Sequence, residues 1–352
     1  VLLLLAFNLF FPLQPSYQGR RLSDWAKDFA LDDWEYTTVQ GRVEAQAKEE
    51  EAAKAISHIG TNALPFALKY CRTRESTLEE RLKSWINAQQ KLAVQIPRDS
   101  DYHRLGLNIF KALGPIGRPA ISNLIQSLGD EDQFTANTAS QALIYIGSDA
   151  IPSLCVALGS ENRRMRVNAA FALMGFQTTA ADAAPHIVQC LNDKYPDVRA
   201  AAAYCLGSVI GETNTTISAL LGVLKDSDVG VRTAGAVSLG HIRSQPDRVV
   251  PALLACMATE TDLPSISPTM VSALRHFGTN AKPWSPILIQ LIESNRFGIW
   301  SGNAESVLVK IDPEAARPLI EARSNRLFRA QSPQVMKTNL PSATDPPTAV
   351  RR

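Results

Sequence analysis

The sequence predicts an all-α protein, an α-solenoid (superhelix) of about eight antiparallel helix pairs, because three features of the chain recur with one period. Apolar segments recur every 30 to 35 residues between residues 112 and 308. Each ends in a pair of residues, of which the first is usually small and the second is Leu or Ile. Prolines recur every 33 residues at Pro119, Pro152, Pro185 and Pro251, except that the position between the last two is Ser218. Arginines recur with the same spacing at Arg166, Arg199 and Arg232. One helix pair cannot bury its apolar face alone, so a fixed period of this length indicates stacked repeats.

Each unit is expected to contain an alanine-rich first helix, as in residues 198–211, and a second apolar helix, as in residues 183–193. A glycine with positive φ ends a helix at low steric cost, so we expect one just past the first helix in most units. These glycines are Gly60, Gly114, Gly147, Gly207, Gly240 and Gly278. The recurring proline suits the first turn of the second helix, where its missing N–H breaks no hydrogen bond. Asp197 and Asp228 lie near the next helix start, where acidic side chains cap free N–H groups.

These motifs resemble HEAT repeats. The resemblance rests on the helix starts Asp197-Val198-Arg199 and Asp228 to Arg232, the A-x-x-L-G helix ends and the P-x-L-I second helices. The motifs are close to the short HEAT-like class named from phycobilisome lyases, and the resemblance covers about eight units between residues 45 and 323. The resemblance implies the solenoid fold and carries almost no information about activity.

Two further segments, residues 17–25 (YQGRRLSDW) and 56–70 (ISHIGTNALPFALKY), carry a narrower resemblance. They are similar to a group of uncharacterised HEAT-repeat proteins from bacteria of the planctomycete and verrucomicrobial type. That likeness implies an N-terminal export or membrane segment and a solenoid outside the cytoplasm.

The first residues differ in composition from the repeats. Residues 1–13 (VLLLLAFNLFFPL) are apolar apart from Asn8, and they are too few for a spanning helix of about 20 residues. They suit the hydrophobic region of a signal peptide. We therefore expect residues 1–16 to be a truncated signal or membrane-anchor segment; the alternative is a first helix that packs on the fold. The protein is then expected in the cell envelope, exported or membrane-anchored, with membrane contact through this segment only.

The rest of the chain divides into three parts. We expect an N-terminal capping region at residues 17–44 and a repeat solenoid at residues 45–327, interrupted by a charged insertion at residues 72–103. Residues 328–352 form a polar, proline-rich tail that we expect to be disordered.

Composition limits the class of partner. Hydrophobic residues make up 45% of the chain and charged residues 20%, which is typical of a globular protein. The formal net charge is +2, so no overall field would gather DNA, RNA or an acidic membrane. We expect no nucleic-acid partner.

The sequence shows no catalytic, cofactor-binding or metal-binding constellation. Its histidines contain no His-x-x-x-His or His-Glu pair and lie one per region, at His58, His103, His186, His241 and His276. His58, His241 and His276 lie near expected helix C-termini, where a basic donor meets free carbonyls. The cysteines form no CxxC pair and suit core packing, at Cys71, Cys155, Cys190, Cys205 and Cys256. No nucleophile elbow, Walker loop or Rossmann glycine run is present.

Basic side chains are the candidate contacts for a partner: Arg163, Arg164, Arg166, Arg199 and Arg232. In one interpretation the regularly spaced arginines bind an acidic partner. In the other, which we favour because their spacing equals the repeat period, each bonds an Asp cap or a carbonyl of an adjacent repeat. Residues 162–166 (NRRMR) add local basicity and are the best candidate for an electrostatic contact.

We expect a non-catalytic scaffold that holds a protein partner on the solenoid surface, with no cofactor. The alternative is a modifying enzyme or lyase that uses the solenoid groove as a substrate cleft. Clustered His, Cys or carboxylate groups facing the groove would favour the enzyme. Aliphatic, amide and mixed-charge residues there would favour the scaffold.

Overall fold

The computed structural model describes residues 14–29, 39–74, 99–209, 214–259, 268–295, 297 and 301–331. Most of the expected N-terminal segment (residues 1–13), most of the insertion (75–98) and the tail from residue 332 lie outside these ranges. Among the described residues, no helix is both long enough and apolar enough to cross a membrane.

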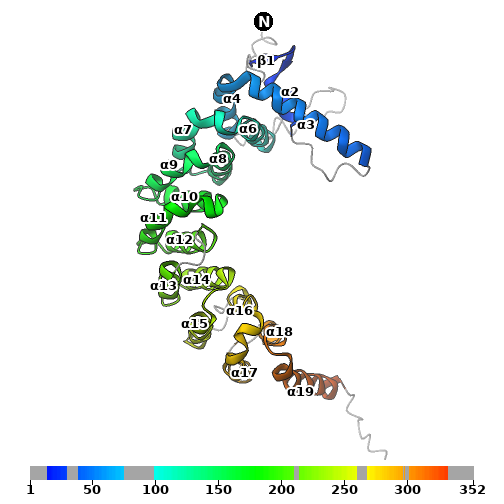
Figure 1. Ribbon diagram of the computed structural model, residues 1–352, viewed down its shortest axis with the longest axis vertical. Coiled ribbons are helices and arrows are strands. Elements are labelled where there is room, and N and C mark those ends of the chain that lie inside the picture. Colours follow the sequence, from blue (N-terminus) through cyan, green and yellow to red (C-terminus); the bar gives the residue numbers. More distant parts are fainter. Residues whose placement is uncertain are drawn as a thin grey trace, which may run out of the picture.

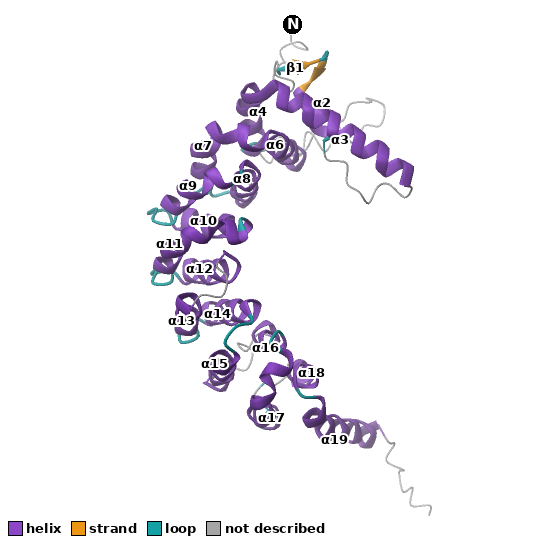
Figure 2. Ribbon diagram, in the orientation of Figure 1, coloured by secondary structure: helices purple, strands orange, loops and turns teal. Residues whose placement is uncertain are grey.

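The described chain is a curved row of helix pairs (Figures 1 and 2). Eight pairs follow one another: α3 (Val39–Ile59) with α4 (Leu64–Cys71), α6 (Asp99–Leu113) with α7 (Ile121–Ser127), α8 (Gln133–Ile146) with α9 (Ile151–Ala157), α10 (Arg163–Gly175) with α11 (Ala184–Cys190), α12 (Pro196–Val209) with α13 (Asn214–Val223), α14 (Val229–Ile242) with α15 (Pro246–Thr259), α16 (Pro268–Arg275) with α17 (Ser285–Glu293), and α18 (Ser301–Ile311) with α19 (Pro313–Gln331). The predicted α-solenoid and its approximate number of pairs are confirmed.

The two helices of a pair lie on opposite sides of the curve. The first helices, from α6 to α18, lie along the inner, concave side in Figure 1, and the second helices, from α4 to α17, lie along the outer side. Each first helix packs against the first helices before and after it, as α12 does against α10 and α14. The second helices pack against the outer face of each first helix. The exposed side chains in the middle of a first helix therefore face the concave side.

Residues 16–28 cover the end of the stack at α3 and α6. A hairpin of β1 (Ser16–Tyr17) and β2 (Arg20–Arg21) leads into α2 (Leu22–Asp28), which packs on α3 and α6. Trp25 is buried, and its indole N–H donates to the carbonyl of Tyr17 at 3.2 Å while the Arg20 guanidinium lies 3.8 Å from its ring centroid. The Asn108 amide of α6 donates to the carbonyl of Ala26 at 2.8 Å, which ties this cap to the first repeats.

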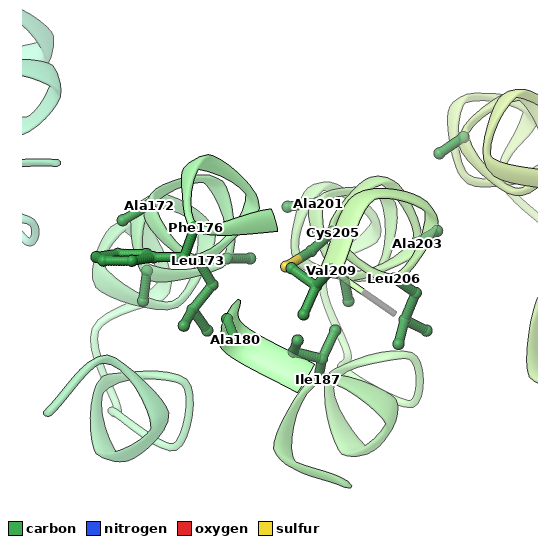
Figure 3. Close-up of a cluster of buried hydrophobic side chains, with 14 of the residues drawn as sticks. Ala172, Leu173, Phe176, Ala180, Ile187, Ala201, Ala203, Cys205, Leu206 and Val209 are labelled. Atoms are coloured by element: carbon green, nitrogen blue, oxygen red, sulfur yellow. The ribbon is translucent and has the colours of Figure 1, made fainter. Parts of the chain in front are cut away.

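The core is a continuous layer between the two rows of helices. Leu206 and Val209 of α12, Leu173 of α10 and Ile187 of α11 are all fully buried, and Figure 3 shows them meeting in one cluster. Small residues such as Ala201 separate the first helices, which lets their backbones approach while the larger side chains fill the layer below. Stability therefore comes from contacts between neighbouring repeats.

The expected glycines divide into two groups. Gly60, Gly114, Gly147 and Gly278 have positive φ and lie where a first helix meets a 3-10 segment, as predicted. The prediction is wrong for Gly207 and Gly240, which lie inside α12 and α14. A Cβ at Gly207 would lie 2.5 Å from that of Ser238, and a Cβ at Gly240 would lie 2.9 Å from the Cα of Ala273. These two glycines permit close packing of α12, α14 and α16.

The prolines also have two settings. Pro152 and Pro185 occupy the first turns of α9 and α11, as expected. Pro119 instead lies in the 3-10 helix η4 (Gly114–Ala120), directly before α7. Pro251 lies within α15, because that helix begins at Pro246.

The described ends of the expected insertion belong to the repeats. Residues 99–103 form the start of α6, and His103 is buried there. Its imidazole nitrogens lie 3.0 Å from the Thr138 hydroxyl and 3.2 Å from the Thr73 carbonyl. At the other end of the solenoid, α19 extends to Gln331, past the expected boundary at residue 327.

Candidate functional site

Arg166 joins two loops of the stack. It lies in the first turn of α10, and its Nε and Nη2 donate to the two carboxylate oxygens of Asp193 at 2.7 and 3.0 Å. Its Nη1 donates to the carbonyls of Ser160 and Glu161 at 2.7 and 3.1 Å. Both charged side chains are largely buried, so this ion pair is part of the repeat packing.

The same arrangement recurs one repeat later. Arg199 donates to both carboxylate oxygens of Asp226 at 2.7 Å and to the carbonyl of Asp193 at 2.9 Å. The hydrogen bonds from Arg199, together with one from the Asp228 N–H, hold the pKa of Asp226 below its usual value. Arg232 continues the series by donating to the carbonyls of Asp226 and Ser227 at 2.6 and 3.0 Å.

The regularly spaced arginines therefore bond carboxylates and carbonyls within the stack, as in the interpretation that the sequence favoured. The guanidinium groups of Arg166 and Arg199 are used by carboxylates of the next repeat, so they are not available to a partner. Asp228 caps α14, since its carboxylate accepts from the Val231 N–H at 3.1 Å. Asp197 does not cap; it lies in the first turn of α12 and pairs with Arg163.

Arg163 and Arg164 are the accessible members of the predicted set. Arg163 bonds both oxygens of Asp197 at 2.8 and 2.9 Å and lies 4.6 Å from the ring centroid of Tyr195. Among the described residues, the Arg164 side chain pairs with Glu131 at 3.9 Å, and both of these side chains are more than half exposed. Exposed pairs of this kind are weak, so Arg164 can exchange its partner at small cost.

Around Arg164, the concave side of α8, α10 and α12 presents mainly uncharged groups. On α8 it presents Asn137 and Gln141, and on α10 it presents Val167 and the 43% exposed ring of Phe171. The half-buried Tyr204 of α12 follows at the position equivalent to Phe171. Amide, aliphatic and aromatic groups therefore alternate along neighbouring first helices.

Two grooves lie on the outer side. One, of about 630 Å³, runs between α9 and α11 and is lined in part by Cys155, His186, Cys190 and Asp193. The second, of about 600 Å³, occupies the equivalent place between α13 and α15. Across the described ranges, no group of three or more His, Cys, Asp or Glu residues has the geometry of a metal site.

The thiols of this region are poorly suited to nucleophilic chemistry. Burial raises the pKa of Cys190 to about 11 and, in α4, the pKa of Cys71 to about 12. Burial also raises the pKa values of Cys155 and Cys205. A reactive cysteine needs the opposite shift, which comes from a neighbouring cation or a helix N-terminus.

One association of histidines was not predicted. The rings of His241 and His276 meet edge to face, with centroids 5.4 Å apart. His241 lies in the last turn of α14 and His276 directly follows α16, so the contact joins two successive first helices. The signal was present in the sequence, because these histidines are 35 residues apart, the same interval that separates the helix ends at residues 238 and 273.

Comparisons with known proteins support the repeat assignment. A family model described as HEAT repeats matches residues 121–207 and 184–267. A search of curated protein sequences finds no significant match.

Similar solved structures include two much longer solenoids. A crystal structure of Kap121p aligns with 84% of this chain at 13% identity and a TM-score of 0.53, and a structure of Kap95p with RanGDP aligns with 91% at 13% identity and a TM-score of 0.50. This chain spans only 35% of that Kap121p chain and 51% of that Kap95p chain. At this identity the likeness shows the fold alone.

A third similar structure is shorter. A chain from the complex of CpcE and CpcF of phycocyanin lyase from Nostoc sp. PCC7120 aligns at 24% identity with a TM-score of 0.40. The alignment covers 44% of this chain and 98% of the chain from that complex. From its eight stacked helix pairs the chain is an α-solenoid, and its residues 121–267 are similar to HEAT repeats.

Proposed function

We propose that this protein is a non-catalytic scaffold that holds a protein partner on the concave side of its solenoid. The observation that carries the proposal is the row of side chains on α8, α10 and α12. Asn137 and Gln141 are exposed on α8 and Phe171 is exposed on the neighbouring α10, where Arg164 forms a weak ion pair with Glu131. Interfaces between proteins combine aromatic anchors and arginine with amide hydrogen bonding in this way.

The similar solenoids support the same class of function. Kap95p was solved with RanGDP, which is a protein partner. Stacked helix pairs supply an extended curved surface, and protein binding is the use that such surfaces most readily serve.

The alternative, a modifying enzyme or lyase, would need a reactive group in a cleft. The outer groove between α9 and α11 brings Cys155, His186 and Cys190 to one lining. The raised pKa values of both thiols count against a nucleophile there, so we propose that the chain has no catalytic site.

The location we propose is the cell envelope, with residues 1–16 as the export or anchor segment. This proposal rests on the apolar run at residues 1–13. Partner capture should therefore begin from envelope extracts.

The test is affinity capture with the full chain as bait and two matched variants. Phe171→Ser removes an exposed aromatic ring from concave helix α10, and Val156→Ser removes an apolar side chain, 79% exposed, from outer helix α9. We expect a saturable protein partner that wild type and Val156→Ser retain and that Phe171→Ser loses.

Two results would contradict the proposal. A partner lost only in Val156→Ser would place binding on the outer side. Recovery of a small molecule or pigment without any protein would make the outer groove a candidate substrate cleft.

A further inference from the structure

We propose that His241, Arg243, Arg275 and His276, the basic cluster, bind an acidic segment of the protein partner. This inference rests on the proposed scaffold function and assigns it a second contact, at the ends of α14 and α16. The ligand class is a peptide segment that carries several carboxylates.

The basic cluster is assembled by the repeat geometry. α14 and α16 pack against one another, and their C-terminal ends bring the two histidine rings to a centroid distance of 5.4 Å. Arg243 is the residue that ends α14, in a left-handed conformation with φ of 56°, and Arg275 is the last residue of α16. All four side chains are exposed.

No acidic group of the described chain neutralises the cluster. Neither arginine side chain takes part in an ion pair or a hydrogen bond within the described ranges, and the two histidine rings contact one another. The contrast with Arg166 and Arg199 is direct, since each of those forms two bonds to one carboxylate. The repeat architecture can pair its arginines, and at this place it leaves them open.

The charges are close enough to affect one another. The pKa of His276 is lowered by partial burial and then by His241, Arg243 and Arg275, in that order. On the side of α18, Lys282 is already paired with Asp312 and Glu314. His276 therefore sits in a positive local field that an incoming carboxylate would relieve.

Helix ends alone do not account for the cluster. Each helix C-terminus carries about half a negative charge, so the two ends supply about one. The guanidinium groups of Arg243 and Arg275 carry two positive charges, which already exceed that amount. An excess of positive charge is left for a ligand.

A carboxylate segment fits these groups better than a nucleic acid does. Arginine binds a carboxylate through two parallel N–H donors, and two arginines beside two histidines can accept more than one carboxylate. Along the same helices the chain presents Thr233, Val237 and Ser272, which add no positive charge along which a phosphate backbone could run. Duplex and single-stranded nucleic acids bind through many phosphate contacts, and this cluster is short.

The test uses a fluorescent octaglutamate peptide as the probe and an octaglutamine peptide as its uncharged match. Fluorescence anisotropy of the full chain at low ionic strength should show saturable binding of octaglutamate alone. Arg243→Glu/Arg275→Glu should weaken that binding by about tenfold or more, because two attractive charges become repulsive. The matched control is Lys69→Glu/Lys225→Glu, which makes the same change in net charge on exposed outer-side lysines and should leave binding within about twofold.

Histidine involvement has its own measurement. A bound carboxylate raises the pKa of His276 relative to the free protein, so octaglutamate binding should tighten as the pH falls from about 7.5 to 6. His241→Gln/His276→Gln should remove most of this pH dependence while the arginines keep binding above background.

Three results would overturn the assignment. They are equal binding of the two peptides, equal losses in the cluster and control variants, and tighter binding of an eight-residue oligothymidylate than of octaglutamate. The scaffold proposal is judged separately, by capture of a partner that depends on Phe171. A captured partner that is insensitive to Arg243→Glu/Arg275→Glu would leave the scaffold standing and remove the cluster from it.

Discussion

Arg199 and Asp226 form a two-pronged ion pair that links successive repeats, with both N–H···O distances at 2.7 Å. The same guanidinium bonds the carbonyl of Asp193 in the preceding loop, and Asp226 accepts the Asp228 N–H at 2.9 Å. One arginine thus connects two loops. The interval from Arg199 to Asp226 is 27 residues, and the same interval separates Arg166 from Asp193. The stack is held by this polar series on one edge and by the apolar layer within.

Removing one member of the pair should destabilise the protein. The two side chains are only 13% and 14% exposed, so Arg199→Met leaves a largely buried carboxylate without its cation. We expect a loss of about 3 kcal/mol in the free energy of unfolding, near the lower end for buried pairs. Urea denaturation of Arg199→Met, of Asp226→Asn and of the double variant gives the coupling energy between the two side chains. Arg163→Met, which breaks an exposed pair, is the control and should shift the urea midpoint little. Equal effects at both sites would show that the buried pair adds nothing.

Acid should weaken the same contact. The folded pKa of Asp226 lies below its usual 3.8, so its contribution to stability is present above that value and is lost as the pH falls through the folded pKa. The urea midpoint of the wild type should therefore drop as the pH is lowered from about 5 to 2. Asp226→Asn cannot titrate at this position, and its curve should fall less steeply. Parallel curves for the two proteins would show that this carboxylate is not linked to folding.

The periodic part of the structure could be predicted from the sequence, and its local exceptions could not. Arg166 and Arg199 recur at the repeat period, which correctly favoured contacts within the stack. Gly207 follows an alanine-rich segment just as Gly147 does, so the motif could not distinguish a helix end from a glycine inside a helix. The difference is set by the neighbouring helix, where Ser238 approaches too closely for any Cβ. The contact between His241 and His276 likewise depends on how far α14 and α16 extend.

Close packing at Gly207 gives a direct test of helix spacing. Gly207→Ala places a methyl group 2.5 Å from the Cβ of Ser238 and 2.8 Å from its Cα, so α12 and α14 must separate. We expect a loss of about 1–3 kcal/mol, although Ala exceeds Gly in helix propensity by about 1 kcal/mol. Gly222→Ala in α13 is the matched control, because nothing lies within 4 Å of its added methyl. It should be neutral or stabilising by up to about 1 kcal/mol. Thermal unfolding followed by circular dichroism distinguishes the two, and stabilisation by Gly207→Ala would contradict the close approach.

Leu206 reports on the apolar layer itself. Its side chain is fully buried beside Val209 in the cluster of Figure 3, so Leu206→Ala should cost about 2–5 kcal/mol. Leu206→Met keeps most of the volume and should cost less than about 1.5 kcal/mol. A negligible change in Leu206→Ala would mean that this face of α12 does not support the stack.

Thiol reactivity separates the scaffold from an enzyme that uses the outer groove. With its pKa raised to about 11, Cys190 is a thiolate in roughly one molecule per thousand at pH 8, and Cys71 is protected further by a pKa of about 12. Cys155 is only half-buried and should react first with an aromatic disulfide reagent, although its pKa is also raised. We expect slow labelling of about one thiol per native chain, and labelling of all five after denaturation. Rapid modification of Cys190 in the native protein, prevented by Cys190→Ser and retained in Cys155→Ser, would reveal an activated thiol in the groove. That outcome would favour covalent chemistry on the outer side over a purely binding role.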